Sequence, residues 1–176
     1  IAVNPVPATT RTLSDFAVSI RYEDLPQEVI EMAKRCILDS FGCGVFGAPT
    51  PWAQAVTRVV NSLGQAQRAS AWGQKGKADV LGAAFINGTS AQGYELDDCH
   101  DQSMSHYGAG VIPAVMACSE DFGDVSGRDM ILAVVAVGIT VAVYGFVALI
   151  VKADDFGLHL AQRGGALAGL GRDRKS

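Results

Sequence analysis

The chain has 176 residues, of which 49% are hydrophobic and 18% are charged, and this balance excludes a disordered polymer. Its formal net charge of -4 argues against nucleic acid as a partner, because a protein that neutralises phosphates needs a basic face. The length is that of one globular domain with its own core.

The first third of the chain contains three stretches with the periodicity of amphipathic helices. The first covers residues 13–20. The second follows Pro26, which suits the first turn of a helix, and we expect Gly42 and Gly44 to end or narrow it. Its apolar stripe consists of Val29, Ile30, Ala33, Cys36, Ile37 and Phe41. The third begins with Thr50 as a cap and Pro51 in the first turn, and it continues to residue 63.

The middle of the chain predicts a connecting loop and then two short helices. Residues 65–77 are polar and contain glycine, which is typical of a loop with one short extended piece. Asp79 is expected to cap a helix over residues 80–86, and Asn87 with Gly88 is expected to end it. Thr89 is then predicted to cap a second helix that leads into an acidic segment.

The second half of the chain predicts a helix around Pro113 and then the longest apolar run. Ser126 and Asp129 have the spacing of a capping box in front of residues 130–151, which include no charged residue. This run is long enough to cross a bilayer, and a membrane-associated protein built around it is one alternative. We predict instead a helix buried on all sides of a bundle, because the amphipathic helices around it need a common core.

Convincing alternating strands are scarce, so the predicted fold class is all-α, a helical bundle around a central apolar helix. We expect residues 1–155 to form this helical domain and residues 156–176 to be a divergent or truncated tail. The cysteines form no CxxC pair, and the first residues lack the basic and apolar regions of a signal peptide. These features predict a reduced, cytoplasmic protein.

The candidate site is an acidic segment that also contains two histidines. Its titratable residues are Glu95, Asp97, Asp98, His100, Asp101 and His106. Carboxylates packed closely raise one another's proton affinity, and histidine titrates near neutrality, so the cluster can both accept and donate protons. Backbone N–H groups at the helix that starts near Gly108 can hold a substrate carboxylate. Asp101 is expected to be an ordinary solvated residue.

Three chemistries fit this cluster. Residues 97–101 spell the DDxxD motif of isoprenoid synthases, which hold magnesium with a second acidic motif, and residues 120–124 repeat the acidic spacing. That second stretch is expected in a loop, where its carboxylates would be solvated. A zinc or iron site from His100, His106 and an aspartate is the second possibility, although the spacing matches no specific pattern. The third is metal-free proton transfer next to a carboxylate.

The third chemistry agrees with a resemblance to a known family. Residues 87–100 read Asn-Gly-Thr-Ser-Ala-Gln-Gly-Tyr-Glu-Leu-Asp-Asp-Cys-His, and residues 106–114 read His-Tyr-Gly-Ala-Gly-Val-Ile-Pro-Ala. They resemble the MmgE/PrpD signature of Asn-Gly-Thr-Ala, Asp-Phe-Asp-Asp-Thr-His, His-Pro-(Gly/Ser) and Val-x-Pro-Ala. Residues 12–17, 29–47 and 70–73 are also similar to the family, so that the resemblance covers roughly residues 10–145.

The resemblance implies a helical domain that carries the site and is normally completed by a smaller lid domain, which is missing here. It implies no metal and no organic cofactor. His106, Asp97 and His100 would be catalytic, with His106 transferring the proton and lying close to Asp97. The substrate-binding residues would be Asp98, Cys99, Gly108 and His159. The chain departs from the family where Cys99 replaces a Thr, where Tyr107 stands for a common Pro and where Tyr144 stands for a frequent Arg.

The family includes 2-methylcitrate dehydratase, cis-aconitate decarboxylase and iminodisuccinate epimerase, which share a carbanion-like step next to a carboxylate. We therefore predict a cofactor-independent lyase of the dehydratase kind that acts on a small polycarboxylate, with an epimerase (isomerase) or a decarboxylase as alternatives. A homodimer is expected. The alternative from a different class is a non-catalytic helical fragment that oligomerises through exposed apolar surface.

Overall fold

The computed structural model describes residues 9–63, 66–101 and 105–141. The described helices and strands are α1 (Thr9–Ser19), a 3-10 helix η1 (Tyr22–Asp24), α2 (Gln27–Gly47), α3 (Pro51–Ser62), β1 (Ala69–Ser70), β2 (Lys77–Ala78), α4 (Val80–Ala91), α5 (Tyr107–Phe122) and a helix over 127–141. Within the described residues the only strands are β1 and β2, an antiparallel pair of two residues each. The fold class is all-α, as predicted.

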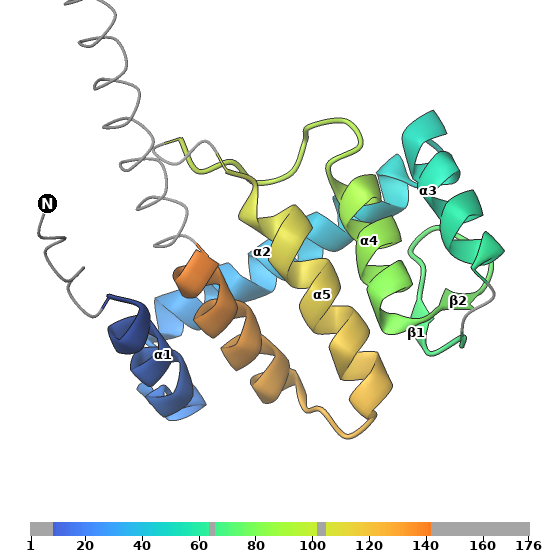
Figure 1. Cartoon of the computed structure of the whole chain (residues 1–176). Helices are drawn as coiled ribbons and strands as arrows, with labels where there is room; N and C mark the ends of the chain where they lie inside the picture. Colours follow the sequence, from blue (N-terminus) through green and yellow to red (C-terminus); the bar gives the residue numbers. More distant parts are fainter. Residues whose placement is uncertain (1–8, 64–65, 102–104, 142–176) are drawn as a thin grey trace, which may run out of the picture.

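The long helix α2 runs along the bundle, with α4 and α5 packed across it (Figure 1). Its buried positions are Ile30, Ala33, Ser40, Gly44 and Gly47, a helical spacing that directs one stripe into the core. At Gly44 a side chain would collide with the Trp72 ring, and at Gly47 it would collide with the backbone of Ser90. The predicted narrowing of this helix by Gly44 is therefore confirmed, although the helix continues to Gly47.

Helix α5 is the central apolar helix of the bundle, between α4 and the helix over 127–141 (Figure 1). Val111, Ile112 and Val115 on α5 pack in one core cluster with Trp72 and with Val134. A second cluster joins the start of α2 to Ile131 and Val135, and a third joins α3, α4 and the two strands. The described core therefore consists of three clusters, which together extend from the 127–141 helix and α5 to α3.

The cap predictions for three helices are confirmed. Thr50 Oγ accepts from Ala53 N, with Pro51 in the first turn of α3. Asp79 Oδ1 accepts from the backbone N–H of Leu81 and Gly82 at the start of α4. Ser126 and Asp129 make the reciprocal bonds of a capping box at 3.1 and 3.2 Å in front of the 127–141 helix.

The prediction that Asn87 and Gly88 end a helix is wrong, and so is the prediction that Thr89 caps another, because α4 continues through all three to Ala91. Contacts with residues far away in the sequence, and not the local Asn-Gly pattern, decide where this helix ends. The Asn87 side chain is bonded to backbone outside the helix, and a Cβ on Gly88 would lie 2.7 Å from the Ala109 carbonyl oxygen. Asn87 thus fixes the β1 region, and Gly88 allows α4 and α5 to approach closely.

The apolar run over residues 130–151 is described only as far as residue 141. In this part Ile131, Val134 and Val135 are buried, whereas Val137, Ile139 and Val141 are exposed. The expectation of burial on all sides is therefore wrong for the described part, because the helix lies at the edge of the bundle. No helix among the described residues is long and apolar enough to cross a membrane.

Candidate functional site

The candidate site lies in the loop between α4 and α5. Glu95 in this loop has a φ of 52°, a left-handed backbone that non-glycine residues rarely adopt. The turn directs successive side chains to opposite sides, so that Leu96 is exposed and Asp97 is buried. Asp97 is the only buried charged residue among the described residues. The fold thus directs one carboxylate inward at the point where the acidic segment meets the bundle.

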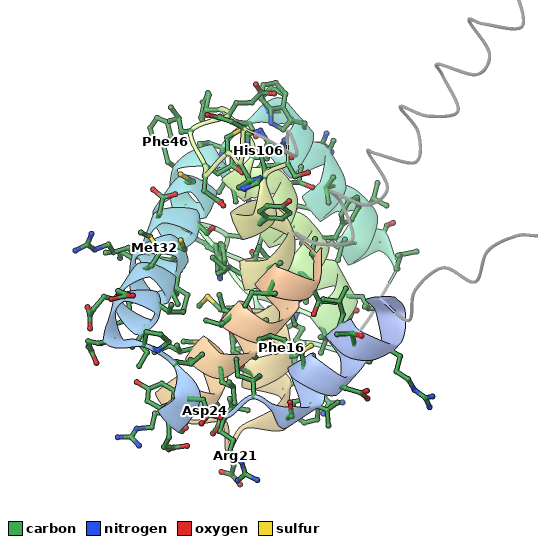
Figure 2. The ribbon with its side chains drawn as sticks, turned by 90° about the vertical axis from the view of Figure 1, so that its left-hand side faces the viewer. Phe16, Arg21, Asp24, Met32, Phe46 and His106 are labelled. Atoms are coloured by element: carbon green, nitrogen blue, oxygen red, sulfur yellow. The ribbon has the colours of Figure 1, made fainter. Side chains whose placement is uncertain are left out.

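Asp97 is paired with His106, the residue immediately before α5. His106 Nδ1 lies 3.3 Å from Asp97 Oδ2, and the two side chains are 24% and 0% exposed. The two atoms are in contact, but their geometry is not that of a hydrogen bond, and both Asp97 oxygens and His106 Nδ1 lack a hydrogen-bond partner among the described residues. Figure 2 shows His106 at the same end of the bundle as Phe46 and at the opposite end from Arg21 and Asp24.

Burial is the largest influence on the Asp97 carboxyl and raises its pKa above the ordinary value. Its own backbone N–H and the neighbouring His106 act in the opposite direction, and the negative charge of Asp98 adds to the rise. The net effect favours the protonated form of a group that has no full set of partners. Burial of a carboxyl without these partners lowers the stability of the fold, and ionisable groups with shifted pKa values concentrate at functional sites.

Asp98 has a different role from its neighbour, because it caps α5. Its Oδ1 accepts from the backbone N–H of Gly108 at 2.8 Å, and the negative charge suits the positive end of the helix. Asp98 thus caps α5 from ten residues earlier in the chain. The N–H of Gly108 is occupied by this carboxylate, which corrects the expectation that it is open to a substrate carboxylate in this structure.

Helix α2 packs beside Asp98 and the start of α5. Cys36, Ser40 and Cys43 follow one another at helical spacing, and the charge of Asp98 acts on both cysteines. Burial, as the largest cause, raises the pKa of both thiols, and the nearby carboxylates raise it further. Neither cysteine is therefore a reactive thiolate. Ser40 between them is fully buried.

The other predicted site residues lie further out. His100 is exposed, its backbone N–H donates to Ser105 O at 3.0 Å, and its ring centroid is 5.7 Å from that of Tyr107. Cys99 and Asp101 are exposed as well. Among the described residues, Asp97 is in contact with His106, and Asp98 accepts from Gly108. His159 lies outside the described residues.

The acidic residues near position 120 belong to the opposite end of α5. Glu120 accepts from Ser70 and lies 3.6 Å from Lys77, and Asp121 pairs with Arg68. Glu120 and Asp121 lie in the last turn of the helix and are paired, which corrects the expectation of a solvated loop for these two residues, whereas Asp124 lies in the loop and is exposed as expected. Twelve residues of helix separate Gly108 from Glu120, roughly 18 Å, so the two acidic motifs do not face one site. Among the described residues no three His, Cys, Asp or Glu side chains are placed to hold a metal ion.

A cavity of about 410 Å³ opens beside Asp98, between α2, α5 and the 127–141 helix. Its described walls are mainly aliphatic, and Cys36, Asp98 and Tyr107 are the polar residues among them. Such walls suit an apolar group and offer few donors for the carboxylates of a polycarboxylate. Neither Asp97 nor His106 is among the described residues that line this cavity.

The structure adds Ser40 to the residues at the site, and the candidates chosen from the sequence did not include it. A signal was present, because Ala33 and Ile37 in the predicted apolar stripe are followed at helical spacing by Ser40. A polar residue at a stripe position predicts a buried hydroxyl. Phe41, which the stripe did include, is more exposed and packs edge-on against Trp72.

Comparisons with known proteins show what the chain is similar to. The chain is 32% identical over 136 residues to a cis-aconitate decarboxylase of Aspergillus terreus, with 75% of this chain and 28% of the relative covered. It is 30% identical over 128 residues to cis-aconitate decarboxylase of Homo sapiens, and 28% identical over 130 residues to that of Mus musculus. These alignments cover 70% and 72% of this chain, respectively, and 26% of each mammalian relative, so the chain spans little more than a quarter of these relatives' length. The MmgE/PrpD N-terminal domain matches residues 11–159, and the chain therefore belongs to the MmgE/PrpD family.

Proposed function

We propose that this chain carries the proton-transfer residues of a lyase that acts on a small polycarboxylate. The observation that carries the proposal is the contact between His106 and the buried Asp97. Relatives that are cis-aconitate decarboxylases favour decarboxylation over the dehydration that the sequence suggested first. An isomerase is the alternative reaction type, because epimerisation needs the same proton transfer.

The roles of the two residues follow from their positions. Asp97 faces the Nδ1 side of the imidazole, which leaves Nε2 for the substrate and stabilises the imidazolium. When a carboxylate leaves as CO₂, the electron pair of the broken C–C bond remains on the substrate carbon. His106 in its protonated form then delivers a proton to the carbon skeleton, and the site needs no oxidant or reductant for this step.

The substrate carboxylates require positive charge near this pair. Asp97, Asp98 and the net charge of -4 do not provide it. We expect the balancing cationic groups from the remainder of the relatives' length, since the alignment covers only 28% of the first relative. The chain of 176 residues should therefore show little or no turnover by itself, because its site is incomplete and open to water.

The test is His106→Ala in a longer natural form of the protein. We expect turnover of a polycarboxylate such as cis-aconitate to fall by about 10²–10⁴-fold, because a positioned general acid or base contributes that much. The assay is run in D₂O and followed by NMR: decarboxylation and epimerisation place deuterium on carbon, and dehydration is read from the loss of the substrate's C–H signal as the alkene product appears.

Asp101→Ala is the matched control, because Asp101 lies in the same acidic segment but is exposed. It should retain wild-type turnover. Full activity of the His106→Ala enzyme would remove His106 from the mechanism. Substantial activity of the 176-residue chain would contradict the view that its site is incomplete.

We also propose that the protein is a homodimer, and exposed apolar residues support this. The outer face of α2 is charged at Glu31 and Lys34 but apolar further on, at Leu38, Val45 and Phe46. Phe46 stacks with the exposed Tyr94, with ring centroids 4.9 Å apart. Leu38→Glu combined with Phe46→Glu should convert the dimer into a monomer in sedimentation equilibrium, whereas a monomeric wild type would contradict the proposal.

A further inference from the structure

Ser40 is a buried hydroxyl that the proposed mechanism does not use. It lies on the core face of α2, between Ile37 and Gly44, and its residue exposure is 0%. Its Oγ has no hydrogen-bond partner among the described residues. Buried hydroxyls are nearly always bonded, and a structural role for Ser40 would predict the usual bond to the carbonyl four residues earlier. Ser90 and Ser119 make that bond within their helices, both at 2.8 Å.

The surroundings of Ser40 Oγ are defined by the first turn of α5. A Cβ added to Gly108 would lie 2.5 Å from Ser40 Oγ and would also collide with Asp98 Oδ1. The serine hydroxyl and the capping carboxylate therefore converge on one point, which is open only because residue 108 is glycine. Asp98 Oδ1 is the carboxylate oxygen at this point, although no hydrogen bond joins it to Ser40 Oγ in this structure.

We propose that Ser40 is a positioning residue of the site: it supports the Asp98 carboxylate, which holds Gly108 and thereby fixes His106 against Asp97. This inference rests on the proposed function for its purpose. The links are the convergence of Ser40 Oγ and Asp98 Oδ1 at Gly108, the 2.8 Å bond from Gly108 N and the 3.3 Å contact of His106 with Asp97. Helix α2 thus sets the position of the imidazole, although Ser40 does not touch it in this scheme.

The test uses Ser40→Ala in the 176-residue chain and follows hydrogen exchange of single amides by NMR. Loss of the hydroxyl should speed exchange of the Gly108 amide by about 2- to 10-fold, the range expected when the hydrogen bond from Gly108 N to Asp98 Oδ1 is weakened. The His106 imidazole resonance should move as well. The Gly82 amide is a matched control within the same protein, because it is also a glycine N–H bound by an aspartate cap, at 3.1 Å from Asp79 Oδ1.

General destabilisation would speed both amides, whereas the proposal predicts a change at Gly108 alone. Ser40→Cys is the second variant, because a thiol fills the same space but is a weak donor, and it should change the two amides in the same selective way. An unchanged Gly108 amide in both variants, or an equal change at Gly82, would overturn the proposal.

A double-mutant cycle identifies the partner of Ser40. In the Asp98→Asn background, Ser40→Ala should have no further effect on the His106 resonance, because the two residues act in one chain of contacts. Additive effects would mean that Ser40 acts through another group and would also overturn the proposal. None of these measurements uses a substrate, so their failure is distinguishable from a failure of the proposed catalytic function.

Discussion

Two buried polar residues ten positions apart, Asn87 on α4 and Asp97 in the loop that follows it, have opposite surroundings. The Asn87 side chain accepts from Trp72 N at 2.7 Å and donates to Ser70 O at 2.9 Å. The Asp97 carboxylate has the contact with His106, but neither of its oxygens has a hydrogen-bond partner among the described residues. The two residues are equally removed from solvent, with exposures of 1% and 6%.

The difference distinguishes buried polar groups that stabilise the fold from buried polar groups that are retained because a reaction requires them. A buried amide with its partners satisfied stabilises one arrangement of α4 and the β1 region. A buried carboxyl without them destabilises the fold, and such groups persist where function requires them. Asn87 belongs to the first kind, and the proposed function assigns Asp97, with His106 in contact with it, to the second.

The substitution with the largest expected effect is Asn87→Ala, which tests whether the Asn87 side chain stabilises the fold. It leaves the Trp72 N–H and the Ser70 carbonyl without their partner, so the free energy of unfolding should fall by about 2–4 kcal/mol. Urea unfolding of the 176-residue chain measures this. Asn61→Ala is the control, since Asn61 is exposed on α3 and its loss should change the free energy by less than about 0.5 kcal/mol. Equal effects of the two substitutions would show that the Asn87 bonds do not hold the fold.

A second substitution sharpens the comparison at the loop that carries Asp97. Glu95 has a φ of 52°, so Glu95→Val places a β-branched residue in left-handed backbone and should lower the free energy of unfolding by about 1 kcal/mol. Glu95→Asn should be neutral, because asparagine tolerates this backbone. If valine were tolerated equally well, the left-handed turn would not be what directs Asp97 inward. Urea unfolding of both variants decides between these outcomes.

The parts of the fold that depend on neighbouring residues could be predicted from the sequence. The caps at Thr50, Asp79 and Ser126 were found because each side chain bonds to backbone two or three residues away. The end of α4 could not be found in this way. Asn87 and Gly88 have the local pattern of a helix end, but their contacts are with residues 70, 72 and 109.

The sequence predicts which residues belong to the candidate site better than it predicts how they are arranged in space. The predicted closeness of Asp97 and His106 is confirmed by their 3.3 Å contact. Two neighbouring aspartates have the same side chain in the sequence, however, and only the path of the loop makes Asp97 a buried acid and Asp98 a helix cap. Ser40 comes from a helix far away in the chain, so its part in the site required the packing of α2 against α5. The catalytic roles of His106, Asp97 and His100 stay predictions.

The central claim is that the buried Asp97 carboxylate does not stabilise the fold. The most direct test, with the smallest expected effect, compares the free energies of unfolding of Asp97→Asn and wild type in urea from pH 3 to pH 8. Burial raises the pKa of Asp97 above its ordinary 3.8, so the wild type loses stability as the pH rises through the raised value. Asparagine has no such transition. We expect the variant to be more stable than wild type near pH 8 and to lose this advantage below pH 3.8. Asp101→Asn, at an exposed residue of the same acidic segment, is the control. An Asp97→Asn variant that is less stable than wild type at pH 8 would show that this carboxylate holds the fold, as Asn87 does, and would contradict the account.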